Sequence, residues 1–202
     1  MDPYDNKEIA KNFGINEEYT GSVSVRNKLR KIVSGWLSGT IIDAGCGNGL
    51  LLENINNYNL YVGADRSIEM LKVAKKKNKV NAYFVQADLN NLPFKDKIVD
   101  NVVCIDALHH LPDDETELNA IKELNRVGRN FIFEIKSFDF LSPLRRLFFN
   151  ISKSNKKDTE IDKISYNSIK LGKVIKSLKQ LGKNKVKVKR VSLLVDWRLI
   201  KC

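Results

Sequence analysis

Ile41-Ile-Asp-Ala-Gly-Cys-Gly-Asn-Gly49 is the stretch that decides how this chain of 202 residues folds. A short apolar run stops at an acid, Asp43, and three glycines follow at alternate positions. Because glycine has no Cβ, the backbone there can turn sharply, take positive φ and let a ligand approach closely. The stretch therefore predicts a buried strand that runs into a ligand-binding bend, and residues 50–56 are expected to begin a helix.

The bend alone is weak evidence, because similar glycine patterns occur in ordinary loops and in dehydrogenases. Three further apolar segments strengthen it, since residues 60–64 end at Asp65, 82–87 at Asp88 and 99–105 at Asp106. An acid at a strand tip about twenty residues after the glycines can accept hydrogen bonds from both hydroxyls of a ribose. The repeated strand and acid predict one pocket at the carboxyl ends of a parallel sheet.

Helix and strand patterns alternate along the rest of the chain. Helices are expected over residues 1–14, 23–36, 68–77, 113–124 and 165–181. The second is amphipathic, with Arg26 and Arg30 on its outer face. Ser67 should cap the third helix, and Asp113 or Asp114 the fourth. Residues 130–135, 185–194 and 197–201 complete the strands.

This alternation predicts the fold class. Strands that alternate with helices need crossover connections, so we expect an α/β fold with a Rossmann-like, mostly parallel seven-stranded sheet, helices on both faces and a C-terminal antiparallel edge hairpin. One domain should span residues 1–202, with N-terminal cap helices over 1–40, a ligand-binding core over 41–136, and a basic substrate-side segment with the closing strands over 137–202.

Charge is distributed unevenly. The formal net charge is +11. Residues 137–202 contain 17 Lys and Arg against 5 Asp and Glu, whereas residues 1–136 are nearly neutral. Such asymmetry favours an anionic partner, RNA before membrane, although lysine-rich solvated surface is the alternative. No apolar run approaches membrane length and no signal peptide is evident, so we expect a cytoplasmic protein. The cysteines have no metal-binding spacing, and no metal is expected.

Four motifs, in order, resemble the class I S-adenosylmethionine-dependent methyltransferases: Asp43-Ala-Gly-Cys-Gly-Asn-Gly49, Gly63-Ala-Asp-Arg-Ser67, Ala87-Asp-Leu89 and Asp106-Ala-Leu-His-His-Leu111. The resemblance covers about residues 4–135 and implies S-adenosylmethionine as cofactor. It implies that Asp43 orients the glycine turn and meets the methionine ammonium, that Asp65 holds the ribose, and that Asp88 with Leu89 holds adenine. The full set of cofactor-binding residues that it implies is Asp43, Gly45, Cys46, Gly47, Asp65, Arg66, Asp88, Leu89 and Asp106.

His109 and His110 are the only histidines and follow the fourth strand, where substrate should meet the methyl group. An imidazole can bind a carboxylate or remove a hydroxyl proton, so both are catalytic candidates. One member of an adjacent pair commonly packs inward, and we expect one functional histidine. The Asn/Asp-Pro-Pro-Tyr/Phe pattern that grips an exocyclic amine is absent, which disfavours amine methylation of bases.

Within the class, the chain is similar to the methyltransferases that esterify the carboxymethyl group on wobble uridine of tRNA. The motif around His109 and His110 and the closing Asp196-Trp197 carry this likeness. The arginine that this family has after the aromatic residue of the first helix is absent after Phe13, and Arg26 could replace it as a catalytic cation. The alternatives are a small-molecule O- or C-methyltransferase similar to quinone-biosynthesis enzymes, and a non-catalytic subunit that binds S-adenosylmethionine or RNA.

The resemblance also implies a partner. Members of the wobble-uridine family commonly act with a small zinc-binding activator subunit that pairs with an edge strand of the sheet. Here the edge would be Ala82–Val85, because the third strand lies outermost in this sheet order. Tyr83-Phe84-Val85 on an open edge would invite association unless a partner covers it.

Overall fold

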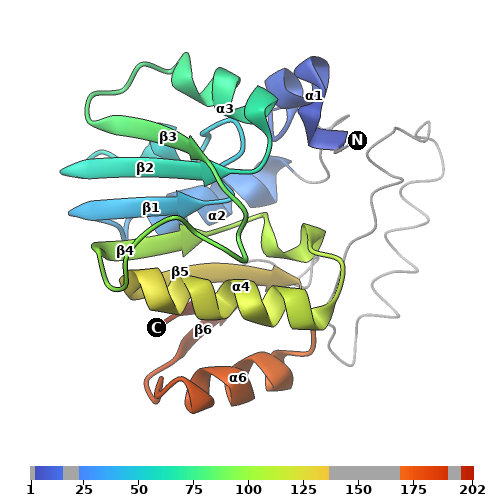
Figure 1. Ribbon diagram of the computed structural model, residues 1–202, viewed down its shortest axis with the longest axis vertical. Coiled ribbons are helices and arrows are strands. Elements are labelled where there is room, and N and C mark those ends of the chain that lie inside the picture. The colour runs from blue at the N-terminus through green and yellow to red at the C-terminus, as the bar shows by residue number, and fades with distance from the viewer. Residues whose placement is uncertain (1–2, 16–22, 137–168, 191–196) are drawn as a thin grey trace.

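The computed structural model describes residues 3–15, 23–136, 169–190 and 197–202. They form a seven-stranded sheet in the order β3-β2-β1-β4-β5-β7-β6 (Figure 1). β1 to β5 are parallel, β7 is antiparallel to β5, and β6 is antiparallel to β7, which confirms the expected fold class. The strands are β1 (Thr40–Ala44), β2 (Leu60–Asp65), β3 (Ala82–Gln86), β4 (Val99–Cys104), β5 (Gly128–Lys136), β6 (Lys187–Arg190) and β7 (Trp197–Lys201).

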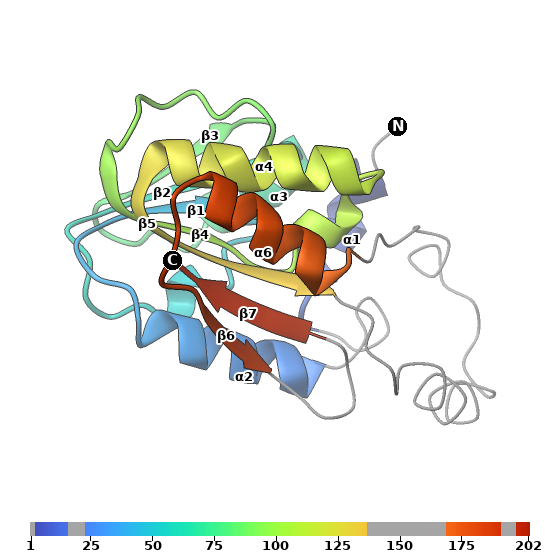
Figure 2. The same ribbon diagram turned by 90° about the horizontal axis from the view of Figure 1, so that it is seen from below.

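Helices cover both faces of the sheet. α2 (Val23–Ser34) lies on one face, and α4 (Asp114–Val127) and α6 (Leu171–Gln180) lie on the other (Figure 2). The central strands are apolar on both sides because both faces are buried; in β5, Ile132 packs in the cluster under α2, whereas Phe131 and Phe133 pack in the cluster under α4 and α6. No helix among the described residues is long and apolar enough to cross a bilayer.

Two predicted helix caps are confirmed. The Ser67 side chain accepts a hydrogen bond from the Met70 backbone N–H at the start of α3 (Ile68–Lys75). Asp113 accepts one from the Thr116 N–H at 2.8 Å at the start of α4. Each cap satisfies a backbone donor that the first turn of a helix cannot pair internally.

The expected helix over residues 50–56 is wrong. That segment is a turn followed by one 3-10 turn, η2 (Leu52–Asn54). A helix of this length is costly to nucleate and asparagine is a poor helix former, whereas the observed turn buries Leu51 and Leu52 in the core under α2. The parts of the expected helix and strand at 165–168 and 191–194 lie outside the described residues.

The N-terminal segment lies beside the glycine turn. It consists of η1 (Pro3–Asp5) and α1 (Lys7–Asn12), and the Asn48 side-chain amide donates to the carbonyls of Ala10 at 3.0 Å and Phe13 at 2.9 Å. The Ser67 hydroxyl donates to the Tyr4 carbonyl at 2.8 Å. These bonds bring the rings of Tyr4 and Phe13 to the carboxyl ends of the strands.

Candidate active site

A cleft of about 680 Å³, including the part open to solvent, lies at the carboxyl ends of the central strands. A second pocket of about 460 Å³ adjoins it, and the two share Phe13, Gly45, Gly47 and Asp106. The first cleft is lined by most of the residues predicted from sequence: Gly45, Gly47, Asp65, Arg66, Asp88, Leu89, Asp106 and His110. The second adds Arg26, Asp43 and Cys46, whereas the predicted catalytic residue His109 lines neither pocket.

The glycine turn is held against the neighbouring strand by its own backbone. The N–H groups of Gly45 and Cys46 donate to the Ala64 carbonyl at 2.7 and 3.0 Å. Gly45 has φ +77°, and a Cβ there would lie 2.5 Å from the Ala107 Cβ. A side chain at Gly45 would therefore strain the backbone and clash across the cleft.

Asp65 organises the same turn. One carboxylate oxygen accepts the Gly47 N–H at 2.7 Å, and the other accepts the Ser67 N–H at 2.9 Å. Each oxygen retains a lone pair, so the carboxylate can also accept hydrogen bonds from ribose hydroxyls in the cleft. The orienting role that the sequence assigned to Asp43 is taken by Asp65.

Asp43 is deeply buried at the floor of the second pocket, with 1% of its surface exposed. The Tyr61 hydroxyl donates to its carboxylate at 2.6 Å. Burial raises the pKa of Asp43 to about 7 despite this hydrogen bond. Tyr61 was not predicted as a site residue, because a tyrosine in a predicted strand gives no signal of its partner.

Asp88 and Leu89 form the rim of the first cleft. Asp88 accepts the Asn90 N–H at 2.7 Å, which tightens the loop after β3. The apolar side chains of Ala87, Leu89 and Leu111 line the cleft beside it. An apolar wall with a carboxylate at its rim suits a planar, hydrogen-bonding base such as adenine.

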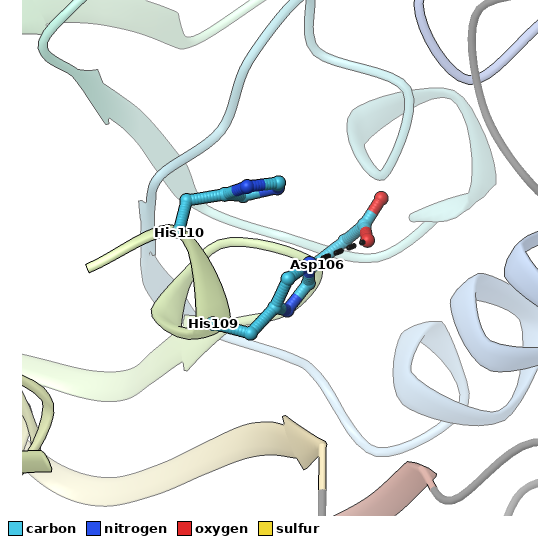
Figure 3. Close-up of side chains that lie close together, drawn as sticks. All are labelled: Asp106, His109 and His110. Carbon is cyan, nitrogen blue, oxygen red and sulfur yellow. Dashed lines mark ion pairs between the residues drawn. The ribbon is translucent and has the colours of Figure 1, made fainter. Parts of the chain in front are cut away.

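The two histidines of η3 (Leu108–His110) lie side by side near Asp106, with ring centroids 4.2 Å apart, but have different surroundings (Figure 3). His109 is 0% exposed, with its ring nitrogens 3.7 Å from the carboxylates of Asp106 and Glu134. His110 lines the first cleft, and its Nδ1 lies 3.1 Å from the Tyr4 hydroxyl. Burial, followed by nearby positive charge, lowers the pKa of both, so each imidazole is neutral near pH 7.

Arg26 reaches the site from α2. Its guanidinium pairs with the Asp106 carboxylate and lies 5.5 Å from the centroid of the Phe13 ring. The prediction that Arg26 and Arg30 lie on the outer face of the helix is wrong, because they are only 3% and 7% exposed. Both line the second pocket, since this side of α2 faces the glycine turn and not solvent.

Glu134, on β5, is a buried acid that sequence reasoning missed. It is fully buried, and its carboxylate accepts the N–H of Asp106 at 3.0 Å. Asp106 itself has φ +59°, an uncommon conformation for a residue with a side chain. An acid within the apolar run Phe131–Ile135 was the available signal, because such a residue needs a polar partner in the core.

Asp106, His109 and His110 lie close enough together to hold a metal ion. Within the described part of the chain, each offers one ligand atom, and these atoms lie within 4.8 Å of one another. The Arg26 guanidinium already pairs with Asp106, and both Arg26 and Lys136 bring positive charge to His109. This environment opposes a further cation, so we assign no metal here.

The fold and the site together define a class of protein. A sheet in the order β3-β2-β1-β4-β5-β7-β6, with a glycine turn after β1 and an acid at the tip of β2, is that of class I methyltransferases. Residues 41–130 match the family model described as "Methyltransferase domain". Residues 41–130 thus match a methyltransferase domain, the class of protein that the fold and the glycine turn also indicate.

Two curated relatives differ in their substrates. The tRNA (carboxymethyluridine(34)-5-O)-methyltransferase of Arabidopsis thaliana is 37% identical over 101 residues, which are 50% of this chain and 24% of the relative. The ubiquinone biosynthesis O-methyltransferase of Serratia proteamaculans is 28% identical over 112 residues, 53% of this chain and 46% of the relative. The chain thus spans less than half the length of either.

Two solved structures share the fold. Magnesium protoporphyrin IX methyltransferase from Synechocystis, solved with bound SAH, has a TM-score of 0.67 at 21% identity, covering 96% of this chain and 90% of that one. A chain of the complex between the Haloferax volcanii Trm112 methyltransferase activator and a methyltransferase has a TM-score of 0.68 at 14% identity, covering 100% and 97%. At these identities the likeness shows the fold alone.

Proposed function

We propose that this protein is an S-adenosylmethionine-dependent methyltransferase that esterifies the carboxymethyl group on wobble uridine of tRNA. One observation carries the proposal: the cleft that holds the glycine turn and Asp65 also holds a neutral imidazole, His110, and adjoins a buried cation, Arg26. The similarity to the Arabidopsis tRNA methyltransferase supports the choice of substrate.

The residues present fit the cofactor. Gly45 and Gly47 leave the turn without side chains, Asp65 offers acceptors for ribose, and Leu89 with Asp88 offers an apolar wall and an acceptor for adenine. Asp43 lies below the turn in the adjoining pocket, where an ammonium group would favour its ionised form. When bound, S-adenosylmethionine supplies a methyl group on a positively charged sulfur.

The chain's own residues need only hold and align the acceptor. A carboxylate is ionised at neutral pH, so no strong base is required, and transfer depends on alignment in a site from which water is excluded. Arg26 has several N–H donors and can bind a substrate carboxylate while it keeps Asp106. His110, held beside Tyr4, is placed to donate or accept a hydrogen bond at the acceptor.

Radiolabelled methyl transfer tests the proposal. Purified protein should label bulk tRNA, and mild alkali should release the label as methanol. A methyl ester hydrolyses under these conditions, whereas a methyl ether or an N-methyl group does not. Label in a lipid extract and not in tRNA would favour the small-molecule alternative, which the Serratia relative supports. Cofactor binding with no transfer to either would favour a non-catalytic subunit.

We further propose that a small zinc-binding activator subunit adds a strand to β3. β3 is an edge strand of the sheet, and Tyr83 on it is 61% exposed. An open edge can pair with a partner strand through its backbone groups. The structural likeness to a methyltransferase solved with the Trm112 activator supports this partner. Co-expression with such a subunit should raise activity on tRNA.

A further inference from the structure

A cluster of lysines surrounds one tryptophan at the opposite edge of the sheet from β3. Trp36 follows α2, and its ring centroid lies 5.9 Å from the Lys189 Nζ and 5.3 Å from the Lys201 Nζ. Lys187 on β6 lies directly opposite Lys201 on β7. β6 and β7 form this edge (Figure 2). We call Trp36, Lys187, Lys189 and Lys201 the tryptophan–lysine face.

The positive charge of this face is not neutralised within the described chain. Among the described residues, no carboxylate lies within ion-pair distance of its three lysines, whereas Lys72 and Lys173 pair with Glu69 and Asp114. The register that joins β6 to β7 places Lys187 directly opposite Lys201. Like charges in directly opposed positions destabilise a strand pair, so this arrangement costs stability that an anionic ligand would restore.

The chemistry of the face fits a phosphodiester backbone. Ammonium groups bind phosphate as point charges, and lysines beside an aromatic ring are typical of surfaces that follow a nucleic acid. In the described residues the face has one aromatic ring and no broad apolar stripe, which a membrane-surface element would need. An RNA is therefore the partner that we favour over an anionic lipid surface.

The position of the face argues for a large substrate. Lys201 pairs with Ile132, four residues before the end of β5 at Lys136, or about 13 Å along the strand. β6 lies three strands from β4, which is about 15 Å across the sheet. A small molecule in the cleft cannot reach this far, whereas a polynucleotide can.

We propose that the tryptophan–lysine face binds the phosphate backbone of the RNA substrate, at a distance from the nucleotide held in the cleft. The inference rests on the proposed action on tRNA and adds a second contact region to it. This region lies level with the middle of β5 and across the edge strands from the cofactor cleft. Its loss should weaken RNA binding without changing cofactor binding.

The test replaces the three lysines of the face by glutamate and measures tRNA binding by the isolated protein at several salt concentrations. The affinity should fall at least tenfold, and the slope of log K against log salt should shrink by about 2 to 3, as expected for three lost phosphate contacts. S-adenosylmethionine affinity should stay within twofold. The control carries the same charge change at three exposed lysines at and after the end of α3, Lys75, Lys76 and Lys79, and should bind tRNA nearly as well as the wild type.

The single variant Lys187→Glu separates binding from folding. It turns a repulsive cross-strand pair with Lys201 into an attractive one, so the melting temperature should hold or rise while tRNA affinity falls. A face that served only solubility would leave tRNA affinity and the salt slope unchanged in both variants, and that result overturns the inference.

Two further outcomes distinguish this inference from the proposed function. Wild-type protein that binds tRNA through the face yet transfers no methyl group to it would remove the proposed reaction and leave the face standing. Vesicles of phosphatidylserine and phosphatidylcholine bound more tightly than tRNA, with that binding lost in the triple variant, would assign the face to a membrane surface and overturn the RNA partner.

Discussion

Asp65→Ala should weaken S-adenosylmethionine binding more than any other single change at the cleft. The carboxylate lines the cleft and also holds the N–H groups of Gly47 and Ser67 at 2.7 and 2.9 Å. The substitution therefore removes the proposed ribose acceptor and loosens the turn that the cofactor would touch. A water molecule cannot replace the Asp65 carboxylate, because the turn needs an acceptor that is fixed in position.

The magnitude follows from the hydrogen bonds lost. A hydrogen bond to a charged group contributes about 1.5 to 3 kcal/mol, which corresponds to a roughly 10- to 150-fold rise in Kd. Asp65→Asn keeps one oxygen acceptor and should fall between the wild type and Asp65→Ala. The two lost backbone bonds should also lower the melting temperature of Asp65→Ala by a few degrees, since about 1 kcal/mol corresponds to about 2–4 °C for a domain of this size.

Calorimetric titration with S-adenosylmethionine measures the effect, and circular dichroism checks the fold. Glu69→Ala is the matched control, because Glu69 lies near the same turn but pairs with Lys72 and does not line the cleft. Folded Asp65→Ala protein that binds S-adenosylmethionine as tightly as the Glu69→Ala control would refute the assignment of Asp65. Folded wild-type protein that does not bind the cofactor at all would refute the methyltransferase proposal.

His110→Ala should lower kcat for methyl transfer at least tenfold and leave cofactor affinity within twofold of the wild type. His109→Ala removes a buried side chain and should mainly lower the melting temperature, by about 5 °C or more. An equal loss of kcat in both variants, at equal stability, would contradict these different roles. Burial raises the pKa of Asp43 to about 7, so wild-type stability should fall as pH rises from 5 to about 7, because the unfolded chain binds fewer protons. Asp43→Asn should lack this fall in thermal melts, and parallel pH profiles would argue against the raised pKa. Tyr83→Glu should leave the melting temperature unchanged but abolish rescue by a co-expressed activator subunit; normal rescue would remove β3 as its docking edge.

The sequence predicted the position of the cleft better than it predicted which histidine lines it. The glycine turn and the strand-end acids are local patterns, and in a parallel sheet the carboxyl ends of neighbouring strands must meet, so Asp65 and Asp88 had to lie at one edge. The two histidines are adjacent in sequence, and nothing local distinguishes them. Only the packing of η3 against β5 buries His109 and leaves His110 in the cleft.

The helix that contributes Arg26 illustrates the same limit. Its apolar periodicity correctly predicts which side packs on the sheet, and it assigns every other side to solvent. The tertiary structure places the glycine turn beside that helix, which buries Arg26 and Arg30 as well. Apolar periodicity predicts which side of a helix packs against the apolar core. It gives no sign of a second, polar neighbour such as the glycine turn.

The sequence by itself thus determined the fold class and the position of the cleft at the carboxyl ends of the strands, because these depend on local patterns and on the crossover connections of a parallel sheet. Only the tertiary structure decided which polar and charged residues meet: Asp43 with Tyr61, Asp106 with Arg26 and Glu134, and Lys187 opposite Lys201. Those pairs join residues from different elements. Their energies depend on distance and burial, which no short stretch of sequence specifies.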